Sequence, residues 1–297
     1  MPYSGPRNPD PGPGESFITI YGYVPSLAFG IIAMICFLTV LAVHTFWLVR
    51  SKRTRWFQGL MIVGCTMESV GYIFRILSHY HPFKVVYFVI QYFMIVCAPI
   101  AFSAAFYLAV QYGLAARTRE SQVLPFRPRV LVITFITIDV ITTIIQVAGA
   151  ALIGVSESAQ GRGESSTVTP AQANDILLAG LAFQCASFLV YLGILTFIII
   201  RSNTLRKSGT KVTSSPSQSS NRSFWILLYI SSALVFTRTL FRLAETAEGL
   251  FSFASTNESL FGVFEFAPVI IAVGLWAVWP IELEMKRMNE MGEEEKV

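Results

Sequence analysis

Seven long stretches of apolar residues, separated by short polar connections, constrain this chain more than any other feature. The stretches are Tyr23–Val49, Phe57–Ser78, Lys84–Leu114, Arg129–Gly154, Asn174–Ile200, Ser223–Ala247 and Leu260–Ile281. Each contains at least about 20 residues, which as a helix would cross about 30 Å of hydrocarbon. Only 13% of the residues are charged, whereas soluble domains carry about 25%. The sequence therefore predicts an all-α polytopic membrane protein, a bundle of seven transmembrane helices.

The distribution of Lys and Arg among the connections predicts how this bundle is oriented. The first, third and fifth connections and the C-terminal segment together hold 16 of them, while the N-terminal segment and the other connections hold 3. Lys and Arg accumulate in cytosolic loops, so the N-terminus is predicted outside and the C-terminus in the cytosol. We thus expect an extracellular tail over residues 1–22, a membrane domain over residues 23–281 and a cytosolic tail over residues 282–297.

Several connecting segments carry further signals. The tail is rich in proline and glycine and has no apolar run of its own, so we expect it to be disordered and not a signal peptide. Residues 201–222 form a connection rich in serine that is suited to phosphorylation or to binding cytosolic regulators. Asn257-Glu258-Ser259 is a glycosylation sequon, although its closeness to a helix end disfavours its use.

Charged residues inside the apolar stretches are the most informative part of the sequence. They are Glu68, Arg75, Asp139, Arg238, Arg242, Glu245 and Glu265. A charge at the middle of a bilayer costs about 2.5–3.5 kcal/mol on insertion scales. Seven such charges would not persist against lipid, so they must face one another or a wet cavity.

Spacing and depth both bring these residues together. Glu68 and Arg75 are two helical turns apart, and Arg238, Arg242 and Glu245 follow one another at i, i+4 and i+7, which gives each set a common face. With the rise of a helix, the charges fall near the midplane or in the outer half of the membrane. We expect a cavity open to the exterior whose substrate-contacting residues are Glu68, Arg75, Asp139, Gln146, Gln184, Arg238, Arg242, Glu245 and Glu265.

The balance of charge in this cluster allows two interpretations. Four acidic residues face three arginines, which leaves one carboxylate that could be protonated or bind a cationic headgroup. The alternative is that the charges are ion pairs that hold the helices together and bind no ligand.

For the remaining polar and aromatic side chains, structural roles are the first interpretation. His44 is expected to be a buried residue with its hydrogen bonds satisfied, with proton transfer or contact with a headgroup as the alternative. His79 and His81 alone are a weak signal for a metal, and the four cysteines fall inside apolar stretches as small core residues. Membrane-interface anchors are predicted at Tyr21, Tyr23, Tyr80 and Trp56.

A series of short motifs in order along the chain resembles the fungal lipid-translocating exporters of the resistance-to-aminocholesterol type, which have seven predicted helices. The motifs are Tyr23-x-Pro25, His44, Glu68-x-x-Gly71-Tyr72-x-x-Arg75, Ala98-Pro99 with Ala105 and Tyr107, Asp139 with Gln146-x-x-Gly149, Gly180-Leu181-x-x-Gln184, and Arg238-x-x-x-Arg242-x-x-Glu245-x-x-x-Gly249 followed by Glu258. The chain departs from the family pattern at Glu265, where an aspartate is expected. It also has Trp279-Pro280-Ile281 in place of His-Pro-Gly.

The resemblance implies a plasma-membrane or endomembrane protein that handles amphipathic molecules such as sphingoid long-chain bases, sterol-like compounds and porphyrins. A transporter or translocator of membrane lipids and lipid-like toxic compounds is the first hypothesis, without a cofactor, since the sequence has no phosphate-binding loop. The alternative is a seven-helix lipid sensor that regulates stress responses. An intramembrane hydrolase is disfavoured because only three histidines occur, and the net charge of +4 gives no reason to expect nucleic-acid binding.

Overall fold

The part of the chain that the structure describes contains seven helices that are long and apolar enough to span a membrane. A computed structural model describes residues 5–12, 14–19, 21–115, 127–161, 168–208, 217–249 and 253–286. The elements are α1 (Leu27–Arg50), α2 (Arg55–Tyr80), α3 (Val85–Ala115), α5 (Pro128–Gly161), α6 (Pro170–Ser208), α7 (Ser217–Glu248), α8 (Glu258–Phe261), the π-helical turn η1 (Gly262–Phe266) and α9 (Ala267–Val278). The prediction of seven transmembrane helices is confirmed, and the chain is an integral membrane protein.

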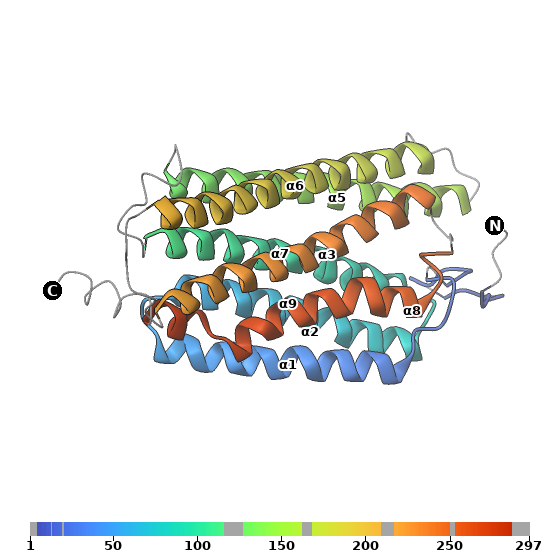
Figure 1. The fold of residues 1–297 in the computed structure, drawn as a ribbon. Helices are drawn as coiled ribbons and strands as arrows, with labels where there is room; N and C mark the ends of the chain where they lie inside the picture. The colour runs from blue at the N-terminus through green and yellow to red at the C-terminus, as the bar shows by residue number, and fades with distance from the viewer. Residues whose placement is uncertain are drawn as a thin grey trace.

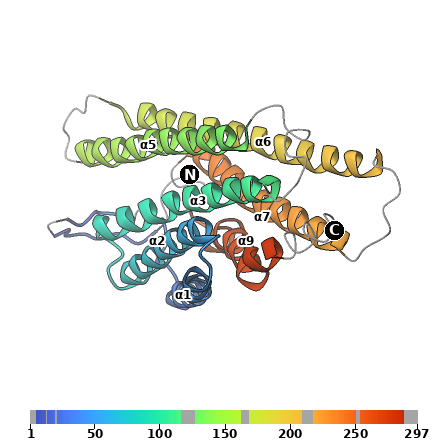
Figure 2. The same ribbon diagram turned by 90° about the vertical axis from the view of Figure 1, so that its left-hand side faces the viewer.

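The helices form three layers, as Figures 1 and 2 show from two directions. Helices α5 and α6 make one outer layer, α3 and α7 lie in the middle, and α1, α2 and α9 make the other outer layer. The N-terminal segment lies beside α8 at one end of the bundle (Figure 1). The predicted orientation of this bundle in the membrane stays a prediction.

Burial follows from these layers. In the most apolar window of α3, 72% of the residues are buried inside the protein, against 22% in α1. Helix α3 has neighbours on several sides, so Phe102, Ala105 and Tyr107 are fully buried in the core. Large apolar side chains of the outer layers, such as Ile32, are exposed and suit contact with lipid hydrocarbon.

Small residues let the helices approach closely, as is common in membranes. A Cβ added at Gly71 of α2 would lie 2.7 Å from the side chain of Ile95 in α3. A Cβ at Gly149 of α5 would lie 2.6 Å from the backbone nitrogen of Leu177 in α6. The second contact is backbone, so the pairing of α5 with α6 depends on the absence of a side chain there.

The seventh span is built from three pieces. Helix α8 continues through the π-helical turn η1 into α9 without a connecting loop. Pro268 lies just after this turn, and a proline cannot donate the backbone hydrogen bond of a regular α-helix. The sequence predicts a span to Ile281, but α9 ends at Val278, since Trp279 and Pro280 interrupt the helix.

The N-terminal segment makes backbone contacts with the connection between α2 and α3. Residues Glu15 and Lys84 form an antiparallel bridge, and the backbone nitrogen of Ser16 donates to the carbonyl of Phe83 over 2.9 Å. Disorder of residues 1–22 as a whole stays a prediction. In the serine-rich connection, residues 209–216 lie outside the described residues, as do residues 287–297 of the predicted cytosolic tail.

Candidate functional site

A large cavity lies at the end of the bundle that carries the N-terminal segment. Its volume is about 610 Å³, within the range of about 300–1,000 Å³ that is typical of ligand pockets. It is lined by the first residues of α3 and α6, the second half of α5 and the last residues of α7, together with Arg75 of α2, Phe261 of α8 and the segment before α1. Its polar lining includes Tyr21, Tyr23, Arg75, Gln91, Tyr92, Asn174, Arg242, Glu245 and Thr246.

The same cavity also has an extensive apolar lining. Helices α3 and α5 supply its side chains, which are Val85, Phe88, Val89, Phe93, Val96, Val147, Ala150, Ala151 and Ile153. The cavity therefore offers polar and charged side chains to a headgroup and apolar side chains to a hydrocarbon chain.

Two arginines of α7 and the glutamate of η1 form a buried ion-pair cluster beside the cavity. Both Arg238 Nη2 and Arg242 Nε donate to the same oxygen of Glu265, over 2.6 and 3.0 Å. Arg238 also donates to the carbonyl of Ile95 over 2.7 Å, and Arg242 Nη1 lies 3.3 Å from Glu245. The i, i+4, i+7 spacing on α7 predicts a common face for these three charges, and the structure places Arg238 and Arg242 of that face against η1.

Glu68 adds a further carboxyl group beside this cluster. Its side chain is 2% exposed and interacts electrostatically with Arg238, Glu265 and Arg242, without a hydrogen-bond partner among the residues that the structure describes. Three carboxylates thus share two arginines here, which agrees with the surplus acid expected from the sequence.

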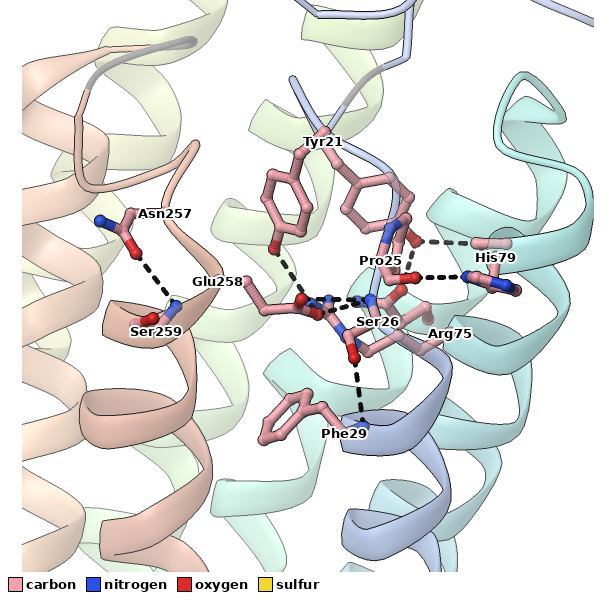
Figure 3. A network of polar contacts seen from close by, with 12 residues as sticks. Tyr21, Pro25, Ser26, Phe29, Arg75, His79, Asn257, Glu258 and Ser259 are labelled. Atoms are coloured by element: carbon pink, nitrogen blue, oxygen red, sulfur yellow. Dashed lines mark hydrogen bonds and ion pairs between the residues drawn. The ribbon is translucent and has the colours of Figure 1, made fainter.

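Arg75 belongs to a separate network, which corrects the expectation that it shares a cluster with Glu68. Its guanidinium is 1% exposed and donates to Glu258 over 2.6 Å and to the Tyr23 hydroxyl over 2.9 Å. Glu258 also accepts from the backbone nitrogen of Ser26 over 2.9 and 3.1 Å. Figure 3 shows how this network joins α2, α8 and the chain just before α1.

Aromatic rings surround the Arg75 guanidinium. Its central carbon lies 4.4 Å from the ring centre of Phe261 and 5.5 Å from that of Phe29, with Tyr21 and Tyr23 slightly farther away. Cation–π contacts of this kind help to compensate a charge that has left water. Arg75 is thus held by one carboxylate, one phenol and four rings.

Tyr21 and Tyr23 are parts of the cavity wall, so their interpretation as interface anchors is wrong. The Tyr21 hydroxyl donates to Gln91 and lies 3.1 Å from the hydroxyl of Ser78. Burial raises the pKa of Tyr21 to about 12 and also raises the pKa of Tyr23 above its ordinary value. Both phenols are therefore neutral hydrogen-bonding groups at physiological pH. Tyr80 and Trp56 are exposed, and their anchoring role stays a prediction.

A second, much smaller cavity adjoins the large one. It has a volume of about 20 Å³ and shares Tyr92, Val96 and Arg242 with the large cavity. Gln146 and Gln184 line it, and the Gln146 amide donates to the Gln184 oxygen over 2.7 Å between α5 and α6. The Arg242 guanidinium lies 5.1 Å from the centre of the Tyr92 ring, so these two side chains stand between the two cavities.

Asp139 lies apart from all these groups. It is 1% exposed on α5, and one of its oxygens accepts from the Tyr107 hydroxyl over 2.8 Å. Its other oxygen is buried without a partner. The expectation that Asp139 lies in the same cluster as the arginines is therefore wrong, since helix depth does not define the direction in which a side chain points.

The nine residues predicted from the sequence thus fall into three groups. Those that line the large cavity are Arg75, Arg242 and Glu245. Those that line the small cavity are Gln146, Gln184, Arg238 and again Arg242. Those that line neither of these two cavities are Glu68, Asp139 and Glu265, of which Glu68 and Glu265 act on the arginines behind the wall.

Glu258 and the tyrosines are absent from the predicted site, although the structure places them in or beside the cavity. Glu258 belongs to the family pattern, but it precedes the last apolar stretch and therefore looks like a loop residue. Tyr21 precedes the first stretch in the same way, and Tyr23 is the first residue of that stretch. These residues share one sequence feature. Each is a polar residue at or just outside the end of a span, and its side chain reaches back into the bundle.

The histidines show no sign of a shared metal centre. His44 is buried, with its ring nitrogens 2.7 Å from the Gln58 side chain and 3.4 Å from the carbonyl of Val273, which confirms it as a satisfied core residue. His79 lies 2.8 Å from the carbonyl of Pro25. Within the described residues, no group of three or more His, Cys, Asp or Glu could hold a metal ion.

Comparison with known proteins gives the family. The family model described as "RTA1 like protein" matches residues 61–287, which is most of the chain. The chain belongs to the RTA1-like family. The match begins inside α2 and extends beyond α9, so it includes the ion-pair cluster, both glutamines and Asp139. This confirms the family resemblance that the sequence motifs predict.

Three relatives in this RTA1-like family come from Saccharomyces cerevisiae. Protein RTM1 is 28% identical over 222 residues, which cover 73% of this chain and 65% of RTM1. Sphingoid long-chain base transporter RSB1 is 24% identical over 278 residues, or 84% of this chain and 70% of RSB1. Protoporphyrin uptake protein 1 is 26% identical over 219 residues, or 72% of this chain and 65% of the relative. The chain thus spans about two thirds of the length of these relatives. No solved structure matches.

Proposed function

We propose that this RTA1-like protein moves amphipathic molecules with a cationic headgroup across the membrane. The observation that carries the proposal is the cavity of about 610 Å³ that is lined by both charged and apolar side chains. A headgroup would lie against Arg242, Glu245 and the tyrosines, while the tail would lie along α3 and α5 or in the adjacent lipid. Two relatives whose names describe long-chain base transport and protoporphyrin uptake support a transporter-type role.

The charges around the cavity favour a cation as the headgroup. Glu68, Glu245, Glu258 and Glu265 are matched by only three arginines, Arg75, Arg238 and Arg242. The groups around the cavity thus include one more carboxyl group than guanidinium group, and an ammonium group would pair with it. A sphingoid long-chain base fits this lining, because its ammonium group and hydroxyls can contact the polar side chains and its one alkyl chain can contact the apolar ones. Glu245 is the best-placed contact, since it lines the cavity and is partly exposed.

The cellular setting of this activity follows from the same proposal. We expect the protein in the plasma membrane, where export of a toxic amphipath would protect the cell, with its larger cavity open to the exterior. Cytosolic regulators would bind at the connection over residues 201–222. Of the nine residues predicted from the sequence, those that line the two cavities would contact the substrate, and Glu68 and Glu265 would act on the arginines behind the wall, while Asp139 lies outside both cavities.

The test is a transport assay with purified protein in liposomes. A fluorescent long-chain base is added on one side, and its passage to the other leaflet is followed over time. We expect faster passage than in empty liposomes, and passage slower by about tenfold or more in Glu245→Gln. Loss of a hydrogen bond to a charged group costs about 1.5–3 kcal/mol, and 1.4 kcal/mol corresponds to tenfold.

Glu248→Gln is the matched control, since it makes the same change on an exposed position of the same helix that does not line the cavity. Passage equal to that in empty liposomes would refute the proposal for this substrate. If the wild type still binds the lipid saturably under those conditions, a lipid sensor is the better description. An equal effect of both substitutions would remove Glu245 from the pathway.

A further inference from the structure

Asp139 is a buried carboxyl group that the cavity does not use. It lies on α5 with 1% of its surface exposed. The Tyr107 hydroxyl of α3 donates to one of its oxygens over 2.8 Å, and the other oxygen is buried without a partner. A buried acceptor left without a hydrogen bond costs about 1–3 kcal/mol, so binding a proton or a hydrogen-bond donor at this oxygen would be favourable.

The groups that face Asp139 do not include a cation. From α3 it is faced by Tyr107, whose ring lies 4.6 Å from that of Tyr191 on α6, and Tyr191 is 3.3 Å from Ser232 on α7. Among the residues that the structure describes, no charged side chain interacts electrostatically with Asp139. An unpaired carboxylate in such a place costs several kcal/mol, and binding a proton removes that charge.

A stripe of polar side chains connects Asp139 with the cavities. Asp139, Thr143 and Gln146 follow one another on α5 at i, i+4 and i+7, and therefore share a face. The Thr143 hydroxyl, like the free Asp139 oxygen, is buried without a partner. Gln146 is bonded to Gln184 at the small cavity, which shares Tyr92 and Arg242 with the large one. The distance along α5 from Gln146 to Asp139 is about 10 Å.

We propose that Asp139 is a proton-binding site, reached from the cavities along Gln146 and Thr143, and that proton exchange there is coupled to substrate movement. The proton comes from water in the cavity and binds to the free carboxylate oxygen, which takes the group from a charge of −1 to zero. Release along the same stripe restores the charge. The coupling rests on the proposed transport function, whereas the proton site itself stands on the buried contacts alone.

The first measurement needs no substrate. Infrared difference spectra of the reconstituted wild type are recorded while the pH is raised, and the carbonyl band of a protonated carboxyl is followed. We expect a band that disappears in Asp139→Asn and persists in the control Glu248→Gln. Tyr107→Phe removes the donor to Asp139 and should shift the band without abolishing it. This second variant keeps the test decisive if Asp139→Asn does not fold. A wild-type band that neither substitution changes, or no such band at all, would overturn the proton site.

The second measurement concerns the coupling. Passage of the fluorescent long-chain base is compared with and without a pH gradient across the liposome membrane. We expect the gradient to change the wild-type rate several-fold and to leave the rate of Asp139→Asn unaffected. A wild-type rate that responds to a sodium gradient instead, or an Asp139→Asn rate that still follows the pH gradient, contradicts coupling at Asp139. If the infrared band of Asp139 is present but the protein moves no lipid, the transport proposal is refuted and the proton site stands.

Discussion

The ion pair between Arg75 and Glu258 is predicted to stabilise the end of the bundle at which the large cavity lies. Glu258→Gln keeps the shape of the side chain but removes its charge. The Arg75 guanidinium then stays buried, with 1% exposure, and retains only neutral partners, namely the Tyr23 hydroxyl, the new amide and the surrounding rings. The substitution therefore isolates the cost of a buried charge without its counterion.

The size of this effect follows from the burial of the two partners. Removing one partner of a fully buried pair costs about 3–5 kcal/mol. Glu258 itself is 24% exposed, so water partly screens the pair and can partly replace the carboxylate. We expect a loss of about 2–3 kcal/mol in the free energy of unfolding. Adding Arg75→Met to Glu258→Gln should restore part of the lost free energy of unfolding. We expect a coupling energy of about 2 kcal/mol between the two positions.

The assay is unfolding of the purified protein in mixed micelles, in which a denaturing detergent is titrated and helix content is followed by circular dichroism. Wild type, both single variants and the double variant complete the cycle. Glu248→Gln is the control, since an exposed substitution should change stability by no more than about 0.5 kcal/mol. If Glu258→Gln is no less stable than this control, or if the coupling energy is near zero, the network at the cavity does not stabilise the bundle.

Three further outcomes are expected from the same unfolding assay. Gly149→Ala should destabilise by about 1–3 kcal/mol because the new Cβ meets the backbone of Leu177, whereas Gly193→Ala, with nothing within 4 Å, should not. Glu265→Gln should cost about 3 kcal/mol, since two arginines lose one shared carboxylate; a loss below about 0.5 kcal/mol would contradict this. Tyr21 has its pKa raised from 10.0 to about 12, so the unfolded chain releases this proton first. The free energy of unfolding should keep its full value below pH 10 and decline between pH 10 and pH 12. In Tyr21→Phe this decline should be about 2 kcal/mol smaller, and an equal decline in wild type and variant would refute the prediction.

The helices could be predicted from the sequence because apolar length is a direct consequence of membrane thickness. The same holds for the burial of Glu68, Arg238 and Glu265, since a charge inside an apolar stretch has few other places to go. The spacing on α7 also predicts correctly that Arg242 and Glu245 share a face, and the structure places them 3.3 Å apart.

The choice of partners could not be predicted in the same way. Spacing along one helix gives depth and a common face, but not the rotation of that helix relative to its neighbours. Arg75 therefore looked like a partner of Glu68, although it lies against Glu258 on another span. Asp139 has a suitable depth, but it points to Tyr107 on α3 and away from the arginines.

The π-helical turn between α8 and α9 has a consequence for how one span can serve two neighbours. Glu258 and Glu265 are seven residues apart, so in a regular α-helix they would project in nearly the same direction. The wider turn at Gly262–Phe266 rotates the later residue relative to the earlier one by roughly a quarter of a circle. One carboxylate can thus reach α2 and the other α7 from a single helix. The turn acts as an angular offset: a regular α-helix of the same length would direct both acids toward the same neighbour and leave one set of arginines without a counterion.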